Sequence, residues 1–280
     1  MQQWSPSGPL LRHRRCDILK TTRILIITAA VLALVACHHG GPRPIRLAID
    51  PEISRLTKEQ IFDRGEQQLA AKKYVRARNY YSYIYENFPN DPLGRRALLR
   101  IADTYFAQGD AVNLVEAQYK YRDFINRYPG SDSADYAMLQ IAMVSYKQME
   151  KPDRDQQKTR EAVDKFTDMI RTFPNSPLRP EADKKLQDAM DRLAKHEHIV
   201  ARFYIKRHSY PAAVQRLNGL VEQYPNYRER DAVFYDLGTA LAGQGRKAEA
   251  RLYFERVISE FPKSEYADKA KRRLDQMKTA

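Results

Sequence analysis

The hydrophobic positions of this chain repeat five times with the same spacing. In each copy an alanine is followed by large apolar residues four and seven positions later and by an aromatic residue eleven positions later, directly before a proline. Steps of four, three and four place these side chains on one face of an α-helix. The alanines are Ala77, Ala117, Ala162, Ala213 and Ala250, and the prolines are Pro89, Pro129, Pro174, Pro225 and Pro262.

Each of these helices is predicted to stop at its proline, which cannot donate a backbone hydrogen bond and forces the preceding residue out of helical geometry. A second helix should precede each one, marked by a small residue that allows close approach. These residues are Gly65, Ala102, Ala142, Ala201 and Gly238. The chain is therefore predicted to be all-α and built from five helix-turn-helix units.

The last unit resembles the tetratricopeptide repeat specifically. The family's order of aromatic, Leu, Gly, apolar, Ala, Phe and Pro is matched by Phe234, Leu237, Gly238, Leu241, Ala250, Phe254 and Pro262. Such helix pairs cannot bury their apolar faces alone, so the resemblance implies a stacked solenoid. Because repeat folds do not fix function, function must be sought elsewhere in the sequence.

One interval departs from the repeat. From a proline to the next small residue there are 13 positions at three junctions, but 27 between Pro174 and Ala201. The extra residues predict a long first helix in unit four, from Pro180 to about His208. This helix divides the chain into N-terminal repeats one to three, residues 57–178, and C-terminal repeats four and five, residues 179–280.

The N-terminus has the features of a bacterial lipoprotein signal. A basic flank precedes an apolar run from Ile24 to Val35, which has signal-peptide length and ends in Leu34-Val35-Ala36-Cys37. This sequence resembles the lipobox, which implies cleavage after residue 36 and acylation of Cys37 with palmitate-type chains. Residues 37–56 are predicted to be a flexible tether, and folded structure is expected from Thr57, an N-cap residue.

The charge and the cysteine content of the chain restrict the ligands and partners that we expect the protein to bind. The full chain carries a formal net charge of +13, and removal of residues 1–36 takes away five basic residues and Asp17 and leaves +9. Besides Cys37, the only cysteine is Cys16, which lies in the predicted signal, so no thiol would remain for a disulfide or a metal. Nucleic acid is not expected as a partner of an exported chain, and the dispersed basic residues indicate solvated helix faces.

No catalytic constellation is found. His196 and His198 point to opposite sides of a helix, and no cysteine completes a metal set. Phosphate loops and the HExxH and GxSxG motifs are absent from the sequence. The carboxylates all fall in helical positions expected to be exposed. We therefore predict a non-enzymatic protein without a cofactor or metal.

Together, five repeats behind a lipobox resemble the outer-membrane assembly lipoproteins of the BamD family, also called ComL or YfiO. The likeness runs from Thr57 to the end and is most specific over residues 201–207, 210–216 and 224–225 and over 122–136. It departs from the family at Leu241 and in the charged stretch 151–158. The resemblance implies a periplasmic scaffold, held by lipid at the outer membrane, in the machinery that inserts outer-membrane β-barrels.

The resemblance also implies partners and a groove. C-terminal repeats of the family bind the barrel-forming subunit (BamA in the family), accessory lipoproteins can accompany the complex, and N-terminal repeats receive unfolded outer-membrane clients. Repeat slots suggest groove positions, for which helix packing is an equal alternative, and Arg96 is the candidate for a client's terminal carboxylate. These positions are Phe62, Leu69, Arg96, Leu99, Phe106, Tyr136, Leu139, Met143 and Tyr146.

A different tetratricopeptide lipoprotein is the alternative hypothesis. A pilotin for a secretin or a coordinator of cell-wall synthesis would share the signal and the repeats. Pilotins usually lack the long central helix and the fourth-repeat motif, so the first interpretation is favoured.

Overall fold

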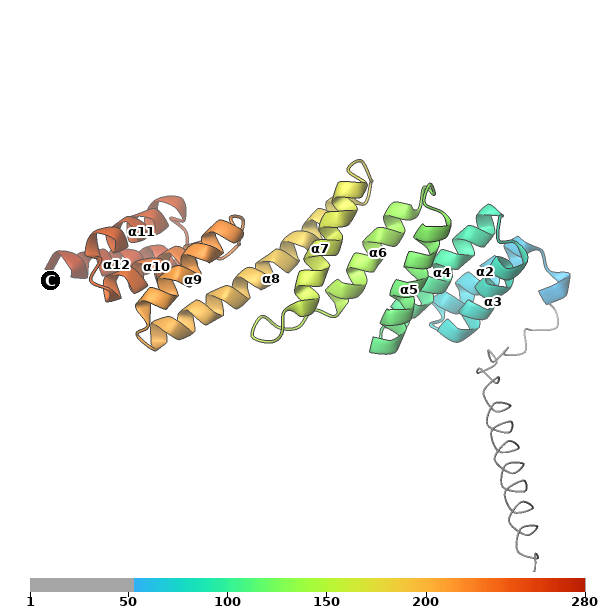
Figure 1. The fold of residues 1–280 in the computed structure, drawn as a ribbon, viewed down its shortest axis with the longest axis horizontal. Helices are drawn as coiled ribbons and strands as arrows, with labels where there is room; N and C mark the ends of the chain where they lie inside the picture. The colour runs from blue at the N-terminus through green and yellow to red at the C-terminus, as the bar shows by residue number, and fades with distance from the viewer. Residues whose placement is uncertain (1–52, 280) are drawn as a thin grey trace, which may run out of the picture. The chain divides into compact units, whose positions relative to one another are not determined.

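The computed structural model describes residues 53–279, all within one compact unit. The predicted signal, Cys37 and most of the predicted tether lie outside these residues. Antiparallel helix pairs follow one another along the unit, each packed on the next (Figure 1). Between residues 53 and 279 no helix is both long and apolar enough to cross a membrane.

The five predicted pairs are all present. After a 3-10 turn, η1 (Ile53–Arg55), they are α2 (Lys58–Ala70) with α3 (Tyr74–Asn87), α4 (Pro92–Gln108) with α5 (Ala111–Arg127), α6 (Ala134–Lys147) with α7 (Gln157–Thr172), α8 (Arg179–Lys206) with α9 (Tyr210–Gln223), and α10 (Arg230–Gly243) with α11 (Lys247–Glu260). A single helix, α12 (Glu265–Thr279), follows and packs on α11. The sequence pattern did not predict α12 as a separate element.

The repeated alanines and the two large residues after them form the core as predicted. All five alanines are fully buried, and the side chains four and seven positions later are no more than 1% exposed. The aromatic residues before the prolines are helix C-caps with non-helical backbone angles, as the prolines predict. They are less buried than their place on the apolar stripe predicts, since one is exposed and four are half-buried: Phe88, and then Tyr128, Phe173, Tyr224 and Phe261.

Two of the small residues are glycines because an aromatic ring lies directly against them. A Cβ added to Gly65 would lie 2.6 Å from the Tyr81 ring, and one added to Gly238 would lie 2.7 Å from the Phe254 ring. Real Cβ atoms do not approach rings so closely, and a packed ring has little room to move. The close approach of each helix pair therefore depends on the missing side chain.

The start of the fold agrees with the prediction and extends it. Thr57 caps α2 in a reciprocal capping box with Gln60. Upstream, Ile53 of η1 is 3% exposed and packs in the first core cluster. The last residues of the predicted tether, up to residue 56, are therefore part of the folded unit.

The long helix α8 belongs to two cores. Ala182 and Ala189 pack with α6 and α7, whereas Ala194 and Ala201 pack with α9, α10 and α11. The helix begins one residue before the predicted Pro180 and ends two residues before His208. The change of packing lies inside α8, so the domain boundary predicted at residue 178 falls short of it.

Candidate functional site

The predicted groove positions lie on the first helices of units one to three, but they differ in accessibility. Three are buried and pack in core clusters: Phe62, Leu99 and Leu139. Arg96 is exposed, and the other five are half-buried: Leu69, Phe106, Tyr136, Met143 and Tyr146. Burial makes helix packing the main role of the first three.

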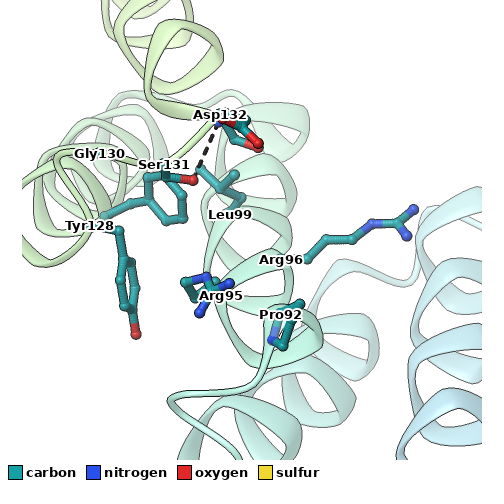
Figure 2. Close-up of a pocket in the computed structure, with 10 residues that line it drawn as sticks. Pro92, Arg95, Arg96, Leu99, Tyr128, Gly130, Ser131 and Asp132 are labelled. Carbon is teal, nitrogen blue, oxygen red and sulfur yellow. Dashed lines mark hydrogen bonds between the residues drawn. The ribbon is translucent and has the colours of Figure 1, made fainter.

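Arg96 contacts the neighbouring helix through an aromatic ring. Its guanidinium carbon lies 4.7 Å from the centre of the Phe62 ring, a cation–π distance. Figure 2 shows the Arg96 side chain extending away from Arg95 toward the preceding repeat. No carboxylate of the described residues pairs with Arg96. Its charge is thus available at the surface on a side chain that an aromatic contact orients.

A pocket of about 510 Å³ opens beside these residues, between α4 and the turn from α5 to α6. Arg95 and Arg96 lie on one side, and Tyr128 and the turn at Ser131 lie on another (Figure 2). Arg95 donates to the carbonyl of Asn90 and lies 5.9 Å from the Tyr128 ring centre. The lining combines two cations, the carboxylate of Asp132, two aromatic residues and hydroxyl groups. This set has more cations than anions and is suited to a segment that carries both negative charge and apolar side chains.

A polar network fixes the first helices of units one to three to each other. Arg100 of α4 donates to Glu66 of α2 at 2.9 Å and to Asp103 at 3.1 Å. Asp103 also accepts from Tyr121 at 2.6 Å and from Tyr136 of α6 at 2.8 Å. Burial and the Asp103 carboxylate raise the pKa of Tyr136, so its hydroxyl stays a donor.

Two further groove candidates contact the next unit through a lysine. Lys147 of α6 lies 4.9 Å from the Phe106 ring centre and donates to the Phe106 carbonyl at 3.1 Å. Lys185 of α8 lies 4.6 Å from the Tyr146 ring centre. Arg96 and Phe62 are thus in contact with each other, whereas Phe106 and Tyr146 are each contacted by a lysine of the next unit. The structure does not bring all nine candidates together at one point.

A second polar cluster lies in the C-terminal repeats. Asp236 of α10, 7% exposed, accepts from Arg202 at 2.7 Å and lies 2.8 Å from Nε2 of the buried His198. Arg202 also donates to the hydroxyl of Tyr266 on α12 at 2.9 Å. Burial opposes the charge of Arg202, but the hydrogen bond and the negative charge of Asp236, together with the Tyr266 hydroxyl, outweigh burial and raise the pKa of the guanidinium. This cluster joins α8, α10 and α12.

The C-terminal cluster corrects the expectation that every carboxylate would be exposed. Asp236 is buried, and the Asp103 side chain is only 12% exposed. A signal in the sequence could have indicated both. Several polar partners lie 33 or 34 residues apart, in or next to the first helices of neighbouring units: Lys58–Asp91, Glu66–Arg100, Asp103–Tyr136, Lys195–Glu229 and Arg202–Asp236.

A smaller pocket of about 400 Å³ lies between α8 and α9. Its lining includes Tyr204, Glu197 and Arg216, and Arg216 donates to Glu197 at 2.7 Å. Within residues 53–279 no group of three or more histidine, cysteine or acidic side chains is arranged to hold a metal ion.

Comparison with known proteins gives the family. The family model YfiO, outer membrane lipoprotein, matches residues 54–239, and a tetratricopeptide repeat model matches residues 232–264. The outer membrane protein assembly factor BamD of Neisseria meningitidis serogroup A is 26% identical over 258 residues, with 87% of this chain and 93% of that protein covered. BamD of Haemophilus influenzae is 22% identical, with 74% and 79% covered.

Among solved structures, the TPR2AB-domain:pHSP90 complex of yeast Sti1 is 15% identical over 75% of this chain and 80% of that chain, with a TM-score of 0.42. The family match includes the helices that carry the Arg96 pocket, the Asp103 network and α8. It spans well over half of the 280 residues. The chain therefore belongs to the YfiO family of outer membrane lipoproteins.

Proposed function

We propose that this protein is a non-enzymatic scaffold of outer-membrane β-barrel assembly, attached through acylated Cys37 to the outer membrane and facing the periplasm. The lipobox at Leu34–Cys37 and the family membership support the attachment. The relatives' name, outer membrane protein assembly factor, supports the role. A repeat solenoid offers extended surfaces for partners and needs no catalytic group for this work.

The N-terminal repeats are proposed to hold the end of an unfolded client. The observation that carries this proposal is Arg96, an exposed cation that lies over the Phe62 ring and belongs to a residue that also lines the 510 Å³ pocket. A carboxylate at the end of an extended peptide would accept hydrogen bonds from the guanidinium. Phe106, Met143 and Tyr146, half-buried on the same set of helices, would contact the client's apolar side chains.

The C-terminal repeats are proposed to dock the barrel-forming subunit. The pocket between α8 and α9 combines an ion pair, Glu197–Arg216, with the ring of Tyr204. When an ion pair is partly exposed, either of its side chains can leave the other and pair with a charged residue of a docking protein. The single core beneath this pocket keeps its walls fixed.

The test of client binding is a charge reversal at Arg96. Arg96→Glu should weaken binding of a synthetic C-terminal β-strand peptide of an outer-membrane barrel by at least about tenfold, because hydrogen bonds to charged groups contribute about 1.5–3 kcal/mol. Amidation of the peptide's carboxylate should weaken binding to the unsubstituted protein and should not affect the variant. Titration by fluorescence anisotropy measures both.

Arg171→Glu is the matched control. Arg171 is an exposed arginine of α7 whose ion pair, to Asp168, lies one turn away on the same helix. Binding by this variant should equal that of the unsubstituted protein. If Arg96→Glu binds the free-acid peptide as well as the control does, the carboxylate role of Arg96 is wrong.

Affinity capture from detergent-solubilised outer membranes tests the scaffold role itself. Co-purification of the barrel-forming subunit supports the proposal. Co-purification of a secretin or of a cell-wall synthase in its place would support the alternative hypothesis of another tetratricopeptide lipoprotein.

A further inference from the structure

The outer face of units one and two carries apolar side chains that the repeat does not need. Of the eight large hydrophobic residues exposed among the described residues, four lie on α3 and α5. Three of them, spaced by three and four positions, form one stripe along α5, with exposures of 73%, 63% and 61%: Val112, Val115 and Tyr119. The fourth is Val75 of α3, 46% exposed.

The repeat register shows that this apolar character is specific to units one and two. Val75 and Val115 both lie two residues before the buried alanine of their unit, where units three, four and five have Arg160, Pro211 and Ala248. Packing of the solenoid therefore does not require a large hydrophobic side chain at this slot. Exposed apolar groups without a packing role commonly mark a contact surface.

Unpaired cations surround the apolar residues. Lys72, Lys73 and Arg76 line a shallow pocket of about 550 Å³ together with Val75, and within residues 53–279 no carboxylate pairs with any of the three. On α5 the ammonium of Lys120 lies 5.5 Å from the Tyr119 ring centre. Of the nearby carboxylates, Asp110 caps α5 and Glu116 is exposed on it. The surface is thus basic as well as apolar.

The basic and apolar residues lie at one edge of the solenoid. Helices α3 and α5 run in the same direction because each is antiparallel to α4, which packs between them, so their first turns lie at the same end of the stack. Arg78 of α3 and Gln108 of α4 are hydrogen bonded at 3.2 Å near this edge, which ties the two units together. We call this surface, formed by residues 72–76 and by the exposed side of α5, the basic edge.

The predicted anchor lies within reach of the basic edge. Fifteen residues lie between Cys37 and Ile53, and the sixteen steps from one to the other span up to about 55 Å when the chain is extended. Helix α2, with 13 residues, then crosses about 20 Å to the edge. An acyl group at Cys37 would therefore hold units one and two close to the membrane surface, where basic and apolar side chains bind anionic phospholipids.

We propose that the basic edge, with Val75, Val112, Val115 and Tyr119 at its centre, lies on the anionic lipid surface of the membrane to which the chain is anchored. This inference rests on the proposed attachment at Cys37. Contact of the edge with lipid orients the helix stack, so that the inner face with Arg96 is presented away from the basic edge and remains open to clients.

Tryptophan fluorescence tests the contact, since the sole tryptophan, Trp4, lies in the predicted signal. Tyr119→Trp and Leu252→Trp place a reporter at the same repeat slot, two residues after the alanine, at positions 61% and 65% exposed. The acylated full chain is reconstituted on vesicles of phosphatidylethanolamine and brominated phosphatidylglycerol. We expect strong quenching of the α5 reporter and almost none of the α11 reporter.

Charge reversal sharpens the test. In the Tyr119→Trp background, the double substitution Lys73→Glu with Arg76→Glu should weaken the quenching. Fewer molecules would then have the basic edge on the lipid surface, because each lost cation weakens contact with an anionic surface about fivefold. Brominated phosphatidylcholine vesicles should likewise give weaker quenching. Equal quenching of both reporters, or none in either, would overturn the proposal. The proposal would also be overturned if the environment of the tryptophan at position 119 changed only on addition of a partner protein and not on addition of lipid.

Vesicle flotation separates failure of this inference from failure of the proposed attachment. A chain that floats with the vesicles but shows no quenching at position 119 is anchored without lying on its basic edge, which refutes the inference alone. A chain that does not float refutes the attachment at Cys37 and the inference with it.

Discussion

The three N-terminal repeats bury their apolar side chains in three separate clusters, whereas the two C-terminal repeats and α12 share one. The N-terminal clusters are joined by polar contacts such as Glu66–Arg100 and Asp103–Tyr136, and the first two also share the half-buried rings of Tyr85 and Tyr105. In the C-terminal half the buried Asp236 cluster adds to a core that is already continuous. Equivalent sequence repeats thus give a set of small units on one side of α8 and a single block on the other.

This difference has consequences for cooperativity. In a solenoid, stability is approximately the sum of repeat terms and nearest-neighbour contacts. Separate clusters allow one N-terminal unit to loosen while its neighbours stay folded, whereas the C-terminal block should open as a whole. We infer that the N-terminal half can adjust to varied clients, and that the C-terminal half suits a fixed docking partner.

Truncation of one core ring on each side of α8 should give the largest effect. Phe254→Ala and Phe166→Ala each remove a fully buried ring, and such changes cost about 3–5 kcal/mol. In Phe254→Ala, hydrogen exchange should accelerate through the C-terminal part of α8 and all of α9 to α12. In Phe166→Ala it should accelerate only in α6, α7 and the first half of α8.

The same exchange experiment can contradict the comparison. If both variants lose protection over the same set of helices, residues 53–279 unfold as one cooperative unit and the division at α8 has no thermodynamic meaning.

Removal of the two polar centres should give a smaller effect. Asp236→Ala leaves buried His198 and half-exposed Arg202 without their acceptor, and we expect a loss of about 3 kcal/mol in the free energy of unfolding. Asp103→Ala should cost less, about 2 kcal/mol, because its charged partner Arg100 keeps Glu66 and only the neutral hydroxyls of Tyr121 and Tyr136 lose their acceptor. Urea denaturation measures both, and a larger loss for Asp103→Ala would reverse the ranking of the two halves.

The glycine contacts should give the smallest effect. Gly238→Ala and Gly65→Ala each force a Cβ against a ring and should destabilise by about 1–2 kcal/mol. The matched control is Gly219→Ala in α9, where a Cβ meets no atom within 4 Å, so the better helix propensity of alanine should stabilise by about 0.5–1 kcal/mol. Thermal melting followed by circular dichroism measures all three. Equal shifts at Gly65 and Gly219 would show that Tyr81 can move aside.

The sequence was sufficient to predict those helices whose position and ends depend on residues within the same helix. Steps of three and four residues and a terminal proline act within one helix, so the buried stripes and the helix ends agreed with the spacing. The length of α8 followed from a single interval in the same way. The burial of the aromatic C-caps was overestimated, because helical periodicity no longer applies in the residue before a proline.

The polar clusters could not be predicted from local pattern because their partners lie one repeat apart. Whether Arg202 and Asp236 come into contact depends on how α8 packs on α10. The spacing of residues within one helix gives no information on this packing. His198 shows the same limit. Its position on the helix was enough to exclude a metal site shared with His196, but it could not show that His198 lies against Asp236 of another helix. Among the groove candidates, the sequence placed all nine on the correct helices but did not separate the buried Phe62, Leu99 and Leu139 from the accessible ones.

Helix α8 packs in two core clusters, and this restricts which insertions and deletions within the helix the fold can accept. Ala182 and Ala189 lie on one side of the helix, and Ala194 and Ala201 lie about 110° around it. Insertion of one codon between the two pairs would turn the C-terminal repeats by about 100° against the N-terminal repeats, whereas insertion of seven codons would restore nearly the same rotation with a shift of about 10 Å along the axis. Insertions and deletions in this helix should therefore be tolerated in steps of about seven codons.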